Sequence, residues 1–138
     1  EWVVVHDAAR PCLPRDNLRR LLRQGLAQPD GAILAIPVRD TLKLSDGSRR
    51  IEATVNRENL WSAQTPQLFP LDRLTEAVEA ALQSGHAPTD EAAAMERIGC
   101  RPALVRGSSA NVKITYPDDI DIVELWFAAR DRGPGALK

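Results

Sequence analysis

Residues 2–11 read Trp-Val-Val-Val-His-Asp-Ala-Ala-Arg-Pro. The first half of this stretch is short, largely apolar and β-branched, without the alternation of a half-exposed strand. Such a run is typical of a strand buried on both faces, as in a parallel sheet. Leucines at helical spacing follow at residues 18–26, and residues 32–36 form a second apolar run. The order strand, helix, strand predicts a βαβ unit with a right-handed crossover.

The pattern changes after residue 40. Residues 41–44 and 51–55 alternate in polarity around Ser45-Asp-Gly-Ser, which predicts an antiparallel hairpin. The apolar face of such a hairpin has to be buried against another surface. An arm that embraces a second subunit is one solution, and packing on its own domain is the other.

Helices and strands are also expected in the second half of the chain. The helices are predicted at 71–82, at 92–98 with Thr89 as N-cap, and from Pro117 onward; the strands are predicted at 103–105 and 112–115. This mixture indicates the α/β class. We assign residues 1–138 to one domain.

Bulk composition excludes several classes of protein. The chain has 138 residues, 43% of them hydrophobic and 27% charged, as in an ordinary single globular domain. A net charge of −1 gives no broad field for nucleic acid or an acidic membrane, so neither partner is expected. The two cysteines have no metal-like spacing, and no apolar run reaches the ~18 residues of a membrane span. A cytoplasmic protein with reduced thiols is expected.

Asp7 and Arg10 follow the first predicted strand, at the sheet edge where open α/β sheets bind ligands. A carboxylate there holds a hydroxyl or Mg²⁺, and an arginine holds a phosphate. The alternative is an aspartate that caps the turn and an arginine on the surface. His6 is expected to be packed or hydrogen-bonded.

Three further segments carry polar side chains suited to binding. Thr41 lies between cationic residues at the base of the hairpin, and residues 54–67 read as a polar binding loop. Lys113 alternates with apolar neighbours and is a candidate phosphate ligand. The corresponding alternatives are a solvated hairpin base, a spacer and a solvent-facing lysine. Thr89 with its two acids is a helix start that orients a hydroxyl or a metal, or simply caps the helix.

Taken together and in order, these segments resemble one family, 2-C-methyl-D-erythritol 4-phosphate cytidylyltransferase of the non-mevalonate isoprenoid pathway. The resemblance covers nearly all of residues 2–130. It is carried by His-Asp-Ala-Ala-Arg-Pro at 6–11, Pro-Val-Arg-Asp-Thr-Leu-Lys at 37–43, Arg57, Trp-x-x-x-Thr-Pro-Gln at 61–67, Thr-Asp-Glu at 89–91 and Asn-x-Lys-x-Thr at 111–115.

The resemblance implies that residues 1–138 are the C-terminal part of a single Rossmann-like nucleotidyltransferase domain. It also implies a projecting antiparallel β-arm at about 40–68, through which the protein works as a homodimer. It also implies the reaction. The phosphate of methylerythritol phosphate attacks the α-phosphate of CTP, pyrophosphate leaves, and Mg²⁺ or another divalent cation assists.

The resemblance assigns roles to matching residues. Arg57 would reach the partner subunit's site and hold the substrate phosphate, which Lys113 would position for attack. Asp7 would accept substrate hydroxyls and help to organise the metal, with Arg10 in support, and Ala8 would line the nucleotide pocket. Further substrate contacts would come from three threonines, Thr41, Thr65 and Thr89.

One departure from the family is large. The Gly-rich loop that carries an arginine and a lysine for the triphosphate, and the Gly-Asp segment that reads cytosine, are not found in this sequence. The domain is therefore expected to be incomplete. We expect the 138-residue chain alone not to transfer cytidylate, which a pyrophosphate-release assay would test.

Two alternatives stay open from the sequence. The first is a sister enzyme of the same fold that acts on ribitol 5-phosphate. The second is a non-catalytic dimerisation or binding module whose functional surface is the hairpin.

Overall fold

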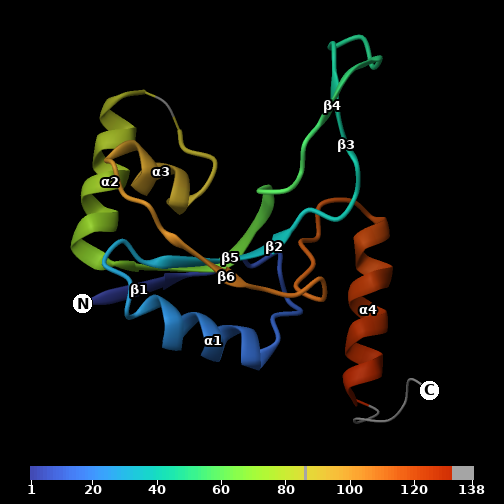
Figure 1. Ribbon diagram of the computed structural model, residues 1–138. Helices are drawn as coiled ribbons and strands as arrows, with labels where there is room; N and C mark the ends of the chain where they lie inside the picture. Colours follow the sequence, from blue (N-terminus) through green and yellow to red (C-terminus); the bar gives the residue numbers. More distant parts are fainter. Residues whose placement is uncertain (86, 132–138) are drawn as a thin grey trace.

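The computed structural model describes residues 1–85 and 87–131, and its centre is a four-stranded sheet in the order β1-β5-β2-β6 (Figure 1). The strands are β1 Trp2–Val5, β2 Ala32–Pro37, β5 Trp61–Pro70 and β6 Ala103–Arg106. β5 runs antiparallel to both β1 and β2, while β6 runs parallel to β2. The α/β class predicted from the sequence is confirmed.

Helices cover both faces of this sheet (Figure 1). α1 (Arg15–Gly25) packs on one face, and α2 (Leu71–Gln83) and α3 (Glu91–Arg97) pack on the other. Neighbouring residues of one strand point to opposite faces, so Ile33 joins the α2–α3 cluster while Leu34 joins the α1 cluster. This two-faced burial explains why residues 32–36 are apolar without alternation.

The prediction that the first strand is buried on both faces is wrong. Val3 and Val5 pack partly against the α2–α3 cluster, but Trp2 and Val4 are 40% and 41% exposed. Trp2 and Val4 point to the other face of β1, and neither belongs to the α1 cluster or to the α2–α3 cluster of the described residues. A run of valines does not show whether one face or both faces of a strand are covered.

The strand order brings separate segments to one edge of the sheet. β1, β2 and β6 all run in the same direction, because β1 and β2 are both antiparallel to β5 and β6 is parallel to β2. Their carboxyl ends therefore meet at one edge, where β5 begins. The predicted strand, helix, strand order holds, but β5 lies between β1 and β2.

The hairpin consists of β3 (Leu42–Ser45) and β4 (Ile51–Val55), and it projects away from the sheet (Figure 1). Every residue of both strands is exposed, including Leu44 at 51% and Ile51 at 68%. The hairpin is shorter than the segment 40–68 expected for the arm, because β5 occupies residues 61–70 in the main sheet.

The end of the chain is described as far as residue 131. α4 (Asp118–Asp131) forms where a helix was predicted, but the strand expected at 112–115 is an irregular segment. Its backbone is tied down by a bond from the Ile114 amide to the Ala9 carbonyl, 2.8 Å long. Within the described ranges, no helix combines the length and apolar character needed to cross a membrane.

Gly31 marks the point at which β2 enters the sheet, and we expect Gly31→Ala to destabilise the fold by about 2 kcal/mol or more. Its φ is +79°, and an added Cβ would lie 2.2 Å from the carbonyl oxygen of Leu68 in β5. Gly47→Ala is the matched control, because Gly47 has a φ of +85° with nothing within 4 Å of the added Cβ. It should cost only about 1 kcal/mol. Urea unfolding would measure both, and equal losses would contradict the steric argument.

Candidate functional site

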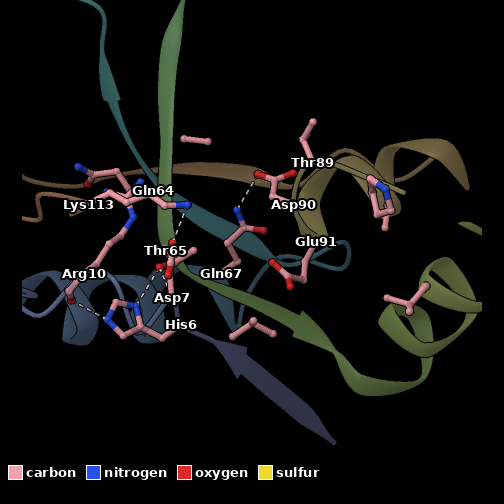
Figure 2. A pocket seen from close by; sticks show the side chains of 15 residues that line it. His6, Asp7, Arg10, Gln64, Thr65, Gln67, Thr89, Asp90, Glu91 and Lys113 are labelled. Carbon is pink, nitrogen blue, oxygen red and sulfur yellow. Dashed lines mark hydrogen bonds and ion pairs between the residues drawn. The ribbon is translucent and has the colours of Figure 1, made fainter. Parts of the chain in front are cut away.

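A cavity of about 600 Å³ opens at the sheet edge described above. It lies between β5, the segments that follow β1 and β6, and the start of α3 (Figure 2). The predicted site residues that line it are Asp7, Arg10, Thr65, Thr89 and Lys113. These side chains come from four separate stretches of the sequence, so the fold brings together most of what the sequence singled out.

Asp7 is the carboxylate of this cavity, and it also shapes the turn after β1. Its Oδ1 accepts from the Ala9 amide at 3.0 Å, and its Oδ2 lies 2.9 Å from Lys113 Nζ. The hydrogen bond from Lys113 and the one from the Ala9 amide hold the pKa of Asp7 below its ordinary value. The carboxylate is therefore charged at neutral pH, and the turn-capping and binding interpretations are both compatible with its place.

Lys113 reaches the cavity from the irregular segment after β6. Its side chain is 51% exposed and that of Asp7 is 28% exposed. An ion pair with this much solvent contributes little to stability. Its importance lies in placing a positive charge and a negative charge side by side on the wall of one cavity.

Arg10 braces the segment that carries Lys113. Its Nη1 donates to the Asn111 carbonyl at 2.8 Å. Burial lowers the pKa of the Arg10 guanidinium, and the charge of Asp7 acts in the opposite direction. Because guanidinium groups stay protonated in proteins, Arg10 adds a second positive charge beside Lys113. This arrangement agrees with a supporting role for Arg10.

Thr65 ties the turn after β1 to the central strand. Its Oγ1 accepts from the Asp7 amide at 2.9 Å and lies 3.0 Å from His6 Nδ1. His6 Nε2 lies 3.1 Å from the Arg10 carbonyl, which only accepts, so Nε2 is the donor of this hydrogen bond. The prediction of a hydrogen-bonded His6 is confirmed, whereas the prediction of a loop is wrong for residues 61–67, which lie in β5.

Sequence reasoning missed two buried amides that fix the segment after β6. Gln64 is 5% exposed and its Nε2 donates to the Ser108 carbonyl at 2.9 Å. Asn111 is fully buried and its Nδ2 donates to the Thr65 carbonyl at 2.7 Å. Their only signal in the sequence was their place inside segments that already contained candidate residues.

The start of α3 differs from the prediction in one respect. Asp90, not Thr89, is the N-cap, and its Oδ1 accepts from the Ala93 amide at 2.8 Å. Thr89 is exposed, lines the cavity and precedes the cap. Glu91 also lines the cavity and was considered only as part of the helix start. Thr89 is thereby free of the capping role, and it is one of the residues that line the cavity (Figure 2).

Three predicted residues do not line this cavity. Ala8 is exposed in the turn after β1, and Thr41 is exposed at the base of the hairpin. Arg57 follows β4, and its Nη1 donates to the Arg39 carbonyl of the same chain. A single chain therefore does not bring Arg57 to Lys113.

The chain's own residues do not fit a resident metal ion at Asp7. Both carboxylate oxygens are engaged, one of them by an ammonium group that repels a cation. Among the described residues, no group of three histidine, cysteine or acidic side chains could hold a metal. The metal role expected for Asp7 stays a prediction, to which the contacts of this carboxylate add no support.

Comparison with known proteins identifies the family that has this arrangement. The family model described as 2-C-methyl-D-erythritol 4-phosphate cytidylyltransferase matches residues 1–129. The chain belongs to this family. The cytidylyltransferase of Vibrio parahaemolyticus is 51% identical over 133 residues, which are 96% of this chain and 56% of that protein. The cytidylyltransferase of Halorhodospira halophila is 57% identical over 128 residues, with 93% and 52% covered.

Solved structures agree with this assignment. A crystal structure of 4-diphosphocytidyl-2C-methyl-D-erythritol synthase has a TM-score of 0.84 at 47% identity, covering 92% of this chain and 57% of that one. The cytidylyltransferase of Francisella tularensis has a TM-score of 0.83 at 37% identity, with 91% and 58% covered. The chain thus spans slightly more than half the length of these cytidylyltransferases, and the predicted fold of an incomplete nucleotidyltransferase domain is confirmed.

Proposed function

We propose that this chain supplies the acceptor site of a cytidylyltransferase, and that the site binds 2-C-methyl-D-erythritol 4-phosphate. The observation that carries the proposal is the juxtaposition of Lys113, Arg10 and Asp7 in one cavity. The cations suit a phosphate, and the carboxylate suits the hydroxyl groups of a sugar alcohol. Membership of the cytidylyltransferase family supports this choice of substrate.

The reaction of the whole enzyme is proposed to be transfer of CMP from CTP, as a step of isoprenoid precursor synthesis. A phosphate oxygen of methylerythritol phosphate forms a bond to the α-phosphorus of CTP. The bond from that phosphorus to the β-phosphate bridging oxygen breaks, which gives the CDP-linked product and pyrophosphate. Catalysis of this kind is mainly positioning and neutralisation of charge.

The residues of this chain have positioning tasks in that reaction. Lys113 has three N–H donors, of which one faces Asp7, so the others are available to the acceptor phosphate. Asp7 accepts from substrate hydroxyls, and Thr65 and Thr89 are further contacts at the cavity. We propose that Mg²⁺, or another divalent cation, accompanies the nucleotide, because Mg²⁺ is usually bound through substrate phosphates.

The β3–β4 hairpin is proposed to be the dimerisation arm. Its support is an exposed apolar surface on a projecting element, with Leu44 and Ile51 both more than half exposed. In a dimer, the partner's surface would cover these side chains. The arm would then carry Arg57 and Thr41 toward the partner's cavity. We place the enzyme in the cytoplasm, in keeping with the two free cysteines.

Isothermal titration calorimetry tests the proposed substrate. We expect the chain to bind methylerythritol phosphate at least about tenfold more tightly than ribitol 5-phosphate, a difference of about 1.4 kcal/mol. Equal or tighter binding of ribitol 5-phosphate would favour the sister enzyme. If sedimentation shows a dimer but neither compound binds, the chain is a dimerisation module instead.

A further inference from the structure

β5 carries three polar side chains that each hold a different wall of the cavity. Gln64 holds the segment with Lys113, and Thr65 holds the turn with Asp7, as described above. Gln67 is the third, and it is 1% exposed in the middle of the central strand. It lies opposite Val5 of β1 and Ile33 of β2, so its backbone is fixed from both sides.

The Gln67 amide bridges the central strand to the start of α3. Its Oε1 accepts from the Ala92 amide at 2.9 Å, and its Nε2 donates to Asp90 Oδ2 at 2.9 Å (Figure 2). The orientation is unambiguous, because a backbone N–H only donates and a carboxylate only accepts. Asp90 Oδ1 is bound by the Ala93 amide, so both oxygens of this carboxylate are engaged by the protein.

This bridge fixes the wall of the cavity that lies across from Lys113 (Figure 2). Thr89 directly precedes Asp90 and is exposed. Its position is therefore set by the position of the first turn of α3. Without the bridge, the Gln67 side chain would no longer hold Asp90 to the central strand. Thr89 and Glu91 line this wall of the cavity on either side of Asp90.

We propose that Gln67 is a positioning residue that sets the distance between Thr89 and the Lys113 end of the acceptor site. This inference rests on the proposed function. It predicts that reversing the donor and acceptor across the bridge preserves binding, while breaking the bridge on either side weakens it.

The test uses Gln67→Glu, Asp90→Asn and the double variant. Gln67→Glu places two carboxylates together, and Asp90→Asn leaves two amide N–H groups facing each other. Each single variant should weaken methylerythritol phosphate binding about tenfold, the range of one charged hydrogen bond. In the double variant, the carboxylate introduced at position 67 accepts from the side-chain amide introduced at position 90 and from the Ala92 backbone amide. Binding should therefore return to within about threefold of the unchanged chain.

Two further measurements separate positioning from general stability. In a Thr89→Ala background, the effect of Gln67→Glu should shrink below about threefold, because residues that act through one contact are not additive. Gln24→Glu, on the exposed surface of α1, should bind as the unchanged chain does. Full additivity with Thr89→Ala, or a folded double variant no better than the singles, would overturn the proposal.

The outcome also distinguishes failure of this inference from failure of the proposed function. Hydrogen exchange at the Ala92 and Ala93 amides, measured without substrate, should be faster in each single variant and restored in the double variant. If the unchanged chain binds no methylerythritol phosphate, the proposed function fails, and the inference fails with it even if the bridge is real. If Gln67→Glu does not fold, Asp90→Asn and the double variant still decide.

Discussion

Binding of methylerythritol phosphate should fall about 100-fold or more when Lys113 is replaced by alanine, and this is one of the two largest effects we expect. Hydrogen bonds to charged groups contribute about 1.5–3 kcal/mol each, and Lys113 has more than one donor available for a phosphate. Losing one such bond alone accounts for about a 10- to 150-fold change in affinity.

A second loss comes from Asp7, which Lys113 neutralises. The carboxylate of Asp7 lies 2.9 Å from Lys113 Nζ, and its pKa is held below the ordinary value mainly by that contact. In Lys113→Ala the carboxylate remains charged at neutral pH and faces the incoming phosphate with no cation between them. The negative charges of Asp7 and of the phosphate repel each other, which adds to the loss of affinity.

Calorimetry on a set of variants separates the two losses. Lys113→Ala with Asp7→Asn should recover part of the affinity, because the repulsion is removed while the missing donors are not restored. Arg23→Ala, on the exposed surface of α1, controls for the loss of one positive charge and should bind normally. An unchanged dissociation constant in Lys113→Ala would remove Lys113 from the acceptor site.

Acid should weaken the contribution of Asp7 to stability in a defined direction. Its folded pKa is below the ordinary value of 3.8, so its contribution is present above that value and is lost as the pH falls through the folded pKa. The difference in urea stability between the unchanged chain and Asp7→Asn should therefore shrink below about pH 4. A difference that grows toward acid would contradict the ion pair.

Local patterns in the sequence predicted the elements whose signals are local. The hairpin at residues 42–55 is indicated by alternation and a Gly-containing turn, and the apolar run of β2 matches burial on both faces. Asp7 was found because strand ends in α/β sheets are binding edges. Each of these arguments needs only neighbours in the chain.

The errors occurred where a side chain is satisfied by a distant partner. β5 read as a polar loop because Gln64 and Gln67 look solvent-exposed in sequence, yet both are buried against segments 44 and 25 residues away, respectively. Buried polar groups are tolerated only when they are hydrogen-bonded, and the partners are visible only in three dimensions. The prediction of a strand at 112–115 was wrong because a strand partner is missing. The alternating segment has no neighbouring strand to pair with among the residues described.

The N-cap of α3 is a second case in which local sequence alone does not decide the structure. Thr89 and Asp90 are adjacent and both suit an N-cap, so propensity does not choose between them. In the fold Asp90 takes the role, and its second oxygen accepts a hydrogen bond from Gln67, a contact across 23 residues. The consequence for the site is direct, because the choice leaves Thr89 to face the cavity.

The affinity for methylerythritol phosphate should also fall about 100-fold or more in Arg57→Ala, although Arg57 lies outside the cavity of its own chain. A guanidinium that binds a phosphate makes two charged hydrogen bonds, each worth about 1.5–3 kcal/mol. Within one chain, Arg57 donates to the Arg39 carbonyl at the base of the projecting hairpin. The proposal that it serves the partner's cavity makes a prediction that no single-chain role shares.

That prediction is that two variants, each unable to bind the acceptor tightly, restore binding when they form a mixed dimer. In a mixed dimer of Arg57→Ala with Lys113→Ala, one site lacks both residues and the other keeps both. Random reassembly makes about half of the dimers mixed, so about a quarter of all sites should be intact. Calorimetry on the unfolded and refolded mixture should therefore give normal affinity at about one quarter of the usual stoichiometry.

The controls decide between the two geometries. Each variant refolded alone should show no tight site, and Arg50→Ala, at the exposed tip of the hairpin, should bind normally. If Arg57 acted in its own chain's cavity, a mixed dimer would contain one damaged residue in each site and the mixture would recover nothing. Because recovery requires both a dimer and an arm that crosses to the neighbour, the stoichiometry of one titration tests both at once.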